Sequence, residues 1–384
     1  MAKEEVLRKQ ALELYLQGKK EVVIARELGL TRQWVHKWVK RYETQGDDWY
    51  CSRSHAPHNR RSTPTGLEAQ VIETRQILFQ SPYLESGAYA IWHRMKEQGI
   101  VPPSVATINR ILRKHGMTRK KVKYQKSGVE YLELPMNTQL MDLIGPRYLR
   151  GGKRYYLLTI ISNDTRHAGV YPIPSKSGYN ITQSVISFWK SYSVPDFLQM
   201  DNELSFKGSN RHPRGLGMLL RTALELDVTP IFIPVREPWR NGVVERFNQL
   251  VERTLLLQKH KDFDELIDHS REFMEQHNKH HTYSTMQHKT PLELDEDIFP
   301  LTPLREDYIL KERPELDSIH LNEIHFIRLV RSDLKISVLN TEICVDASLM
   351  YTYVEVILLI NEHVLLIKQD NRVVQRFEFL MPLS

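Results

Sequence analysis

Apolar residues in the first fifty positions recur at the spacing of amphipathic helices. The pattern predicts three short helices between about residues 4 and 42, with Gly29 ending the second and Thr31 as the N-cap of the third. The tight turn between the last two helices has helix-turn-helix spacing, in which the final helix enters the major groove of DNA. Val35 and Val39 would face the core, which leaves six polar candidates for DNA contact: Arg32, Gln33, His36, Lys37, Lys40 and Arg41. A plain three-helix bundle with a solvated basic face is the alternative.

A second helical module follows at residues 66–126. Helical periodicity covers residues 67–80 and 88–98, and Ser104 begins a third helix after two prolines. This arrangement resembles a second helix-turn-helix, and the basic run 119–126 after it is either a solvated linker or a segment that follows DNA. The outer face of the third helix carries the DNA-binding candidates Arg110, Arg113 and Lys114.

The middle of the chain changes to strands that alternate with helices. Three strands come first, with a hairpin turn at Gly151 and Gly152, and the later strands are separated by helical segments. This order predicts an α/β domain of the ribonuclease-H-like type. Strands are expected at 138–144, 155–162, 168–172, 197–200 and 229–233, and helices at 180–192, 216–226, from near 241, and 264–281.

The last ninety residues switch to alternation with a period of two, which is typical of half-buried strands. Tight polar turns separate five or six short strands, and this pattern favours a small β-barrel. The strands are expected at 323–330, 335–338, 342–345, 354–360, 363–368 and 372–379.

These patterns predict a multidomain chain: N-terminal all-α helix-turn-helix modules, a central α/β ribonuclease-H-like core and a C-terminal small β-barrel. A basic segment with few apolar residues separates the two helical modules, and its candidates for phosphate contact are Arg53, Arg60 and Arg61. Three potential zinc ligands in or beside it lack a fourth partner, which argues against a structural zinc. The expected boundaries are 1–49, 50–65 (linker), 66–126, 127–295 and 296–384 (linker and barrel).

Composition narrows the range of functions. The 384 residues are 41% apolar, with a net charge of +6, which permits nucleic-acid binding without requiring it. Only two cysteines are present, and no apolar run approaches the roughly 18 residues of a membrane span. The N-terminus also lacks a signal-peptide pattern, so a cytoplasmic location is expected.

Three acids are placed where they could share one site. Asp142 lies within a predicted strand, Asp201 ends another, and Glu245 falls on the first turns of the helix that begins near Asn241. Carboxylates are hard ligands suited to Mg²⁺ or Mn²⁺, and two such ions about 3.5–4 Å apart support in-line phosphoryl transfer. Spacing alone is weak support, because a chain with 47 acidic residues offers many such triples.

The segments around these acids resemble a known family. Met141-Asp142, Met200-Asp201-Asn202 and the block from Pro238 to Asn248, Pro-Trp-Arg-Asn-Gly-Val-Val-Glu-Arg-Phe-Asn, look like the three acidic motifs of DDE transposases with a retroviral-integrase-like core. The closest match is to bacterial insertion-sequence transposases, and it covers roughly residues 137–293.

The resemblance implies a function. Asp142, Asp201 and Glu245 would be the catalytic metal ligands for two Mg²⁺ or Mn²⁺ ions, and Arg240, Arg246 and Asn248 would contact DNA. The expected reaction is cleavage at the ends of a mobile element followed by strand transfer into target DNA. The expected partners are double-stranded DNA and further copies of the chain, at least a dimer, on the bacterial nucleoid.

Two features depart from the family pattern. Glu203 stands where glycine is usual, and the interval between the last two acids is long because of a polar loop at 207–215. Glu203 is expected at the surface rather than on a metal. Two other functions stay open: a non-catalytic DNA-binding regulator, and a nuclease acting on RNA–DNA hybrids, against which the two upstream DNA-reading modules argue.

Overall fold

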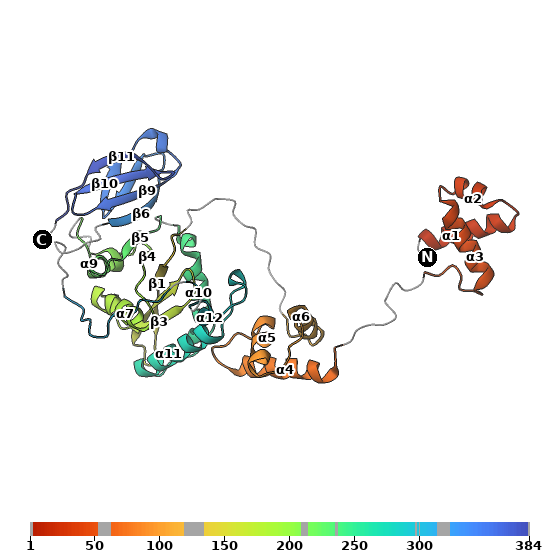
Figure 1. The fold of residues 1–384 in the computed structure, drawn as a ribbon, viewed down its shortest axis with the longest axis horizontal. Coiled ribbons are helices and arrows are strands. Elements are labelled where there is room, and N and C mark those ends of the chain that lie inside the picture. Colours follow the sequence, from red (N-terminus) through yellow and green to blue (C-terminus); the bar gives the residue numbers. More distant parts are fainter. Residues whose placement is uncertain are drawn as a thin grey trace. The chain divides into compact units, whose positions relative to one another are not determined.

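The chain folds into two compact units, residues 1–63 and 64–384, each considered by itself (Figure 1). The structure is a computed structural model. It describes residues 3–52, 63–118, 134–208, 214–234, 237–295, 298, 300–312 and 323–382. Among the helices of these ranges, none combines the length and apolarity needed to cross a membrane.

The first unit contains the three predicted helices α1 (Lys3–Leu16), α2 (Glu21–Glu27) and α3 (Arg32–Thr44). Thr31 caps α3 as predicted, because its side chain accepts a hydrogen bond from the Trp34 amide. Gly29 has φ +65°, a left-handed conformation that glycine adopts without strain, and so ends α2. The helices enclose a small apolar core formed by Ala11, Ile24, Ala25, Val35 and Val39.

The second unit begins with the predicted second helical module, α4 (Thr65–Gln80), α5 (Ala88–Glu97) and α6 (Val105–Lys114). Ser104 caps α6 by accepting a hydrogen bond from the Thr107 amide. The module packs on the core that follows, since Tyr83 lies in the same apolar cluster as Phe247 and Phe273.

The core is a mixed sheet covered by helices on both faces (Figure 1). Alternate residues of β1 enter different apolar clusters: Met141 packs with α7 and α9, and Leu140 with α10 and α11. The strands are β1 (Thr138–Tyr148), β2 (Arg154–Ser162), β3 (Ala168–Ile173), β4 (Phe197–Met200) and β5 (Thr229–Phe232). The helices are α7 (Gly178–Ser191), α8 (Leu204–Lys207), α9 (Met218–Glu225), α10 (Gly242–Arg253), α11 (Phe263–His280) and α12 (Pro291–Asp295).

The C-terminal strands extend this same sheet. β6 (Glu323–Leu329) pairs in parallel with β5, and its other edge pairs with β9, which gives the order β11-β10-β9-β6-β5-β4-β1-β2-β3. The remaining strands are β7 (Lys335–Val338), β8 (Thr341–Cys344), β9 (Tyr353–Leu359), β10 (Val364–Gln369) and β11 (Arg372–Glu378), with β7 and β8 as a separate hairpin.

All six predicted C-terminal strands therefore form, but the pairing of the described strands is open and does not close into the expected barrel. The reason lies in β6. Both of its edges are already paired, one with the core and one with β9, so β11 has no free edge of β6 on which to close.

Candidate active site

Asp142 and Asp201 lie side by side on neighbouring parallel strands. β1 and β4 pair in parallel, with Leu140 beside Gln199. Two residues further along each strand stand Asp142, within β1, and Asp201, directly after β4. Both side chains therefore emerge at the same level of the sheet.

The start of α10 is fixed to these two strands by Asn241. The side chain of Asn241 donates a hydrogen bond to the Met141 carbonyl (3.2 Å) and accepts one from the Gln199 side chain (3.1 Å). Asn241 is buried and does not cap the helix through its side chain, although it occupies the expected N-cap position. Glu245 lies on the first turn of α10, and its charge contributes to the raised pKa of Asp142.

The electrostatics of the site reflect this gathering of acids. Burial raises the pKa of Asp142 to about 6; the Leu143 amide opposes the rise, and the charges of Asp201, Glu245 and Glu203 add to it. Burial also raises the pKa of Asp201 and of Glu245. A buried carboxylate whose pKa is raised further by neighbouring negative charges favours a bound cation.

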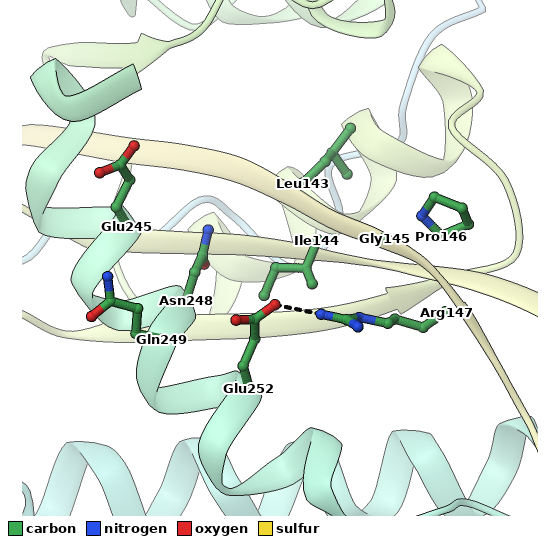
Figure 2. Close-up of a pocket in the computed structure, with 9 residues that line it drawn as sticks. All are labelled: Leu143, Ile144, Gly145, Pro146, Arg147, Glu245, Asn248, Gln249 and Glu252. Atoms are coloured by element: carbon green, nitrogen blue, oxygen red, sulfur yellow. Dashed lines mark hydrogen bonds and ion pairs between the residues drawn. The ribbon is translucent and has the colours of Figure 1, made fainter. Parts of the chain in front are cut away.

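Asn248 orients Asp142. Its amide nitrogen donates to Oδ2 of Asp142 (2.8 Å), and its oxygen accepts from the hydroxyl of Thr159 (2.8 Å), the residue opposite Asp142 on β2. Figure 2 shows Asn248 one turn beyond Glu245 on α10. The sequence-based role of Asn248 was DNA contact, whereas here its side chain is used within the protein.

An open groove of about 630 Å³ runs beside the acids, between the second half of β1 and α10 (Figure 2). An ion pair between Arg147 and Glu252 links its two walls. The groove is lined by Leu143, Ile144, Gly145, Pro146, Arg147, Glu245, Asn248, Gln249 and Glu252.

The donor set suits a hard divalent cation, but the carboxylates are not gathered into a finished coordination site. Within the described ranges, no three His, Cys, Asp or Glu side chains converge closely enough to hold a metal. Asp142 instead accepts hydrogen bonds from Leu143 and Asn248, and Asp201 accepts one from the Glu203 amide (2.9 Å). The three carboxylates fit Mg²⁺ or Mn²⁺ by chemistry, since both cations prefer oxygen ligands.

Glu203, the departure from the family pattern, forms an ion pair with Lys176. Its side chain is partly exposed, and its backbone amide serves Asp201. The Glu203 amide thus stabilises the turn after β4, and its side-chain charge adds to the raised pKa of Asp201 and, as the smallest contribution, to that of Asp142.

The DNA-binding candidates differ in availability. On α3, Arg32, Gln33, His36, Lys37 and Lys40 are exposed, although Arg32 and His36 both contact Glu21. Arg41 is partly buried and bonds to Gln45. The α6 candidates Arg110, Arg113 and Lys114 are exposed, with Lys114 paired to Glu68, and Arg246 on α10 is also exposed. Arg53, Arg60 and Arg61 lie outside the described residues.

Arg240 is in a different environment from the other candidates. Its side chain is only 7% exposed, and it bonds to the equally buried Glu237 (3.0 Å). Its guanidinium also lies over the ring of Tyr353, 4.7 Å from the centroid. These contacts hold Arg240 inside the protein.

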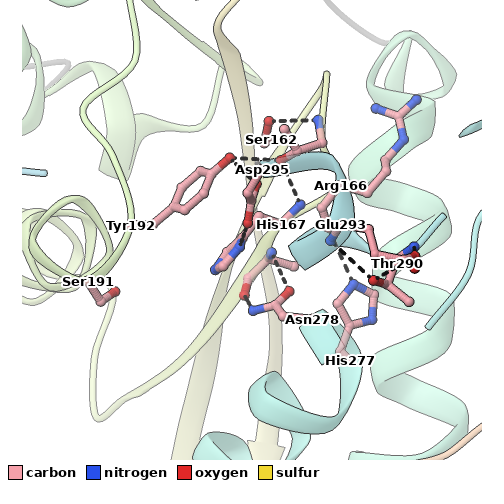
Figure 3. Close-up of polar contacts among 12 residues, drawn as sticks. Ser162, Arg166, His167, Ser191, Tyr192, His277, Asn278, Thr290, Glu293 and Asp295 are labelled. Carbon is pink, nitrogen blue, oxygen red and sulfur yellow. Dashed lines mark hydrogen bonds and ion pairs between the residues drawn. The ribbon is translucent and has the colours of Figure 1, made fainter. Parts of the chain in front are cut away.

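The segment after α11 is fastened to the sheet by polar contacts (Figure 3). The buried carboxylate of Asp295, at the end of α12, contacts Nδ1 of His167 (2.5 Å) and accepts a hydrogen bond from the Tyr192 hydroxyl (2.8 Å). Thr290 and Glu293 exchange hydrogen bonds as a capping box that begins α12. This segment therefore closes the core.

Sequence reasoning missed two residues of the C-terminal sheet that touch the loops carrying the acids. Arg328 on β6 bonds to Asn202, and Tyr353 on β9 bonds to Glu237. The sequence did contain a signal for Arg328. Arg328 shares the alternating register of Ile324 and Phe326, which face the core, so the pattern placed a charge among buried positions.

Family models match two parts of the chain. A homeodomain-like domain matches residues 2–48, which include α1 to α3. An integrase core domain matches residues 226–291, which include β5, α10 with Glu245, and α11. The chain thus combines a homeodomain-like domain with an integrase-type core, and the two matches confirm the resemblance to DDE transposases carried by the acidic motifs.

No curated protein matches the chain in sequence. Among solved structures, the HTLV-2 integrase catalytic core domain in complex with magnesium is 14% identical, covering 42% of this chain and 97% of that one, with a TM-score of 0.33. A chain of the simian T-cell lymphotropic virus intasome in complex with PP2A regulatory subunit B56 gamma is 14% identical over 58% of this chain and 80% of its own, with a TM-score of 0.37. The BIV integrase catalytic core is 16% identical over 41% and 93%, with a TM-score of 0.32.

Proposed function

We propose that this chain is a DDE-type transposase that cleaves and joins DNA at the ends of a mobile element. The observation that carries the proposal is the placement of Asp142 and Asp201 at one level of parallel strands, with Glu245 on a helix pinned to both strands by Asn241. Carboxylates supplied by two neighbouring strands and a helix, beside an open groove, are the type of ligands that metal-dependent phosphoryl transfer uses.

Asp142, Asp201 and Glu245 would hold Mg²⁺ or Mn²⁺, with two ions expected. Bound there, the cations would supply Lewis-acid stabilisation of the negative charge that develops on the phosphoryl oxygens. The side chains around the acids prepare this binding: Asn248 fixes the Asp142 carboxylate, and the Glu203 amide fixes that of Asp201.

The reaction has two in-line steps. In the first, a water oxygen attacks the phosphorus at the element end, the bond from phosphorus to the 3′ oxygen breaks, and a 3′-hydroxyl and a 5′-phosphate are left. In the second, that 3′-hydroxyl attacks a phosphodiester of target DNA and displaces another 3′-hydroxyl. The groove between β1 and α10 would receive the strand end, with the exposed Arg246 near the DNA backbone.

The remaining modules would bring DNA to this site. Residues 1–49 and 66–126 would read the element ends through the exposed faces of α3 and α6, and the 50–65 linker would follow the phosphate backbone. Since two ends must be processed together, we infer an assembly of at least two copies on nucleoid DNA. Residues 296–384 belong to the same core sheet in part, through β6.

The test uses labelled duplexes from both flanks of the element that encodes the chain, incubated with Mg²⁺ or Mn²⁺. Asp142→Asn, Asp201→Asn and Glu245→Gln should each lower cleavage and joining by at least about 100-fold, because losing a ligand should cost no less than losing a residue that only orients one. Asp268→Asn and Glu275→Gln, exposed acids of α11, serve as matched controls that keep full activity.

Activity that survives in all three site variants would refute the metal-site assignment. Wild-type protein that binds the ends tightly yet never cuts them with either cation would instead support a non-catalytic DNA-binding regulator.

A further inference from the structure

The C-terminal sheet is joined to the core by a continuous interior. β5 and β6 pair in parallel through Ile231 with His325 and Phe232 with Phe326, and the rings of Phe232 and Phe326 stack 5.1 Å apart. One apolar cluster contains residues of α7 and α9 together with residues of β6, β9 and β10. The interface resembles the inside of a domain rather than a contact between tethered domains.

Arg328 reaches from β6 to the turn that carries Asp201. Its side chain, 5% exposed, donates hydrogen bonds to Oδ1 of Asn202 (2.8 Å), to the Ile233 carbonyl (3.2 Å) and to the Ser337 carbonyl (2.8 Å). Asn202, the residue after Asp201, in turn donates to the Ile233 carbonyl (2.6 Å). This network ties the end of β4 to the end of β5.

The environment of Arg328 is unusual for a buried cation. Across the described part of the chain, no carboxylate forms an ion pair with it, and its hydrogen bonds go to Asn202 and to backbone carbonyls. Burying a charge without a counter-charge is costly unless its hydrogen bonds hold something that the protein needs. What Arg328 holds is the turn beside Asp201.

Tyr353 makes the corresponding contact to the segment that leads into α10. Its hydroxyl donates to the Glu237 carboxylate, 2.7 Å from Oε2, and its ring lies under the Arg240 guanidinium. Glu237 precedes the short 3₁₀ turn Pro238–Asn241, which runs directly into α10 and Glu245. Tyr353 pairs with Leu329 across β6 and β9, next to the pair of Arg328 and Val354, so the side chains of Tyr353 and Arg328 leave opposite faces of the sheet.

We propose that the C-terminal sheet completes the active site, with Arg328 and Tyr353 as positioning residues for Asp201 and Glu245 respectively. The inference rests on the proposed metal site, and it adds that this site is assembled only when β6 and β9 are docked on the core. Arg328 contacts Asn202, the residue that follows Asp201, and Tyr353 contacts Glu237, which precedes the turn leading into the helix of Glu245. The third acid, Asp142, lies inside β1 and needs no such support.

The experiment uses the full chain without DNA and measures two quantities. The first is Mn²⁺ affinity, from the EPR signal of free Mn²⁺ during titration. The second is hydrogen–deuterium exchange of the backbone in residues 200–207 and 237–248. The variants are Arg328→Met, Arg328→Lys and Tyr353→Phe, and the controls are the exposed Arg376→Met on β11 and Tyr351→Phe in the turn before β9.

We expect Arg328→Met to weaken Mn²⁺ binding by about 10-fold, the usual size of an effect on residues that orient metal ligands. Exchange should rise in 200–207 for Arg328→Met and in 237–248 for Tyr353→Phe, while both controls behave as wild type. Arg328→Lys should have a Mn²⁺ affinity and an exchange rate between those of wild type and Arg328→Met. Its ammonium keeps the charge but cannot reach three acceptors in the fixed geometry of a guanidinium.

Variants with the Mn²⁺ affinity and exchange of the controls would overturn the inference. If Arg328→Met unfolds the whole sheet, Tyr353→Phe decides alone, since it removes only a hydroxyl from a partly exposed side chain. If wild-type protein binds no Mn²⁺, the proposed function fails, and the local exchange of the two segments still tests whether β6 and β9 hold them.

Discussion

Asn248 donates a hydrogen bond of 2.8 Å to the carboxylate of Asp142, one helical turn beyond Glu245. A neutral amide therefore orients the most strongly perturbed acid of the site without neutralising it. An arginine or lysine at this position would supply the same hydrogen bond but would also cancel part of the charge that attracts a cation.

Asn248→Asp should make stability strongly dependent on pH. Two carboxylates in contact cannot both ionise easily, so the pKa of the pair rises in the folded state above its unfolded value. The folded protein therefore binds a proton at this pair more tightly than the unfolded chain does, which stabilises the fold at low pH. This stabilisation is lost as pH rises through the folded pKa, and the cost at pH 8 is on the order of 1–3 kcal/mol.

Urea denaturation at pH 5 and pH 8 measures this difference. Gln249→Glu is the control, because it adds the same charge at the next, exposed position of α10. Equal stability of Asn248→Asp at the two pH values would mean that residue 248 does not contact Asp142.

Mg²⁺ should stabilise the wild-type protein more at pH 8 than at pH 5. Burial raises the pKa of Asp142 to about 6, so at pH 5 a proton occupies the carboxylate that the cation needs. Without metal, the same raised pKa means that the folded protein gains stability as pH falls below about 6. Thermal unfolding with and without 10 mM Mg²⁺, roughly saturating for a weak site, measures both effects.

The Mg²⁺ response should disappear in Asp142→Asn and persist in Asp268→Asn. A shift of equal size at both pH values, or one retained without Asp142, would place the bound cation elsewhere.

The two aspartates could be brought together from the sequence, but their supports could not. Asp142 lies within one strand with a clear apolar pattern and Asp201 directly follows another, and the parallel pairing of these strands brings the two positions to the same level. Glu245 followed from the motif that begins its helix. Arg328 and Tyr353 belong to strands that were found correctly, but local periodicity does not say which edge a strand pairs with. The same reason explains why the barrel was predicted wrongly. Its strands could be predicted from local periodicity, whereas the pairing of β6 with β5 is a long-range contact that local periodicity does not show.

Asn241→Ala should destabilise the protein by about 1–3 kcal/mol, the cost of leaving buried polar groups unpaired. The substitution would free the Met141 carbonyl and the Gln199 amide nitrogen. In the described structure the Gln199 amide oxygen already lacks a partner, so that whole amide would be unsatisfied. Chemical denaturation measures the loss of stability, and Asn361→Ala, in an exposed turn, is the control.

The cation affinity of Asn241→Ala should fall as well, because α10 would no longer be fixed to β1 and β4. A variant as stable as the control would show that packing alone positions α10.

Asp295→Asn should loosen the end of the core. The substitution removes the charge that Asp295 places against His167 and weakens the acceptor of the Tyr192 hydroxyl, at a cost of about 2–4 kcal/mol for a buried contact of this kind. Tyr192→Phe should cost less, because His167 keeps its partner. Hydrogen exchange in 290–295 should rise in both variants, with Asp268→Asn as the exposed control. Unchanged exchange in this segment would mean that the capping box of Thr290 and Glu293 holds α12 without help from Asp295.

Lys37 should contribute more to DNA binding than Arg32, although both are exposed on α3. Arg32 lies 3.9 Å from Glu21, which competes with phosphate for its charge. The amine of Lys37 instead lies over the Trp38 ring, 5.6 Å from its centroid, and forms no ion pair with a carboxylate of the described residues. Each phosphate contact contributes a slope of about −0.9 to the dependence of log affinity on log salt. Lys37→Ala should therefore weaken binding to element-end duplexes and make the salt slope less negative by about one.

Lys19→Ala is the matched control, because the amine of Lys19 is paired with Glu27, and it should leave the slope unchanged. A slope that stays the same in Lys37→Ala would remove α3 from the phosphate-binding face.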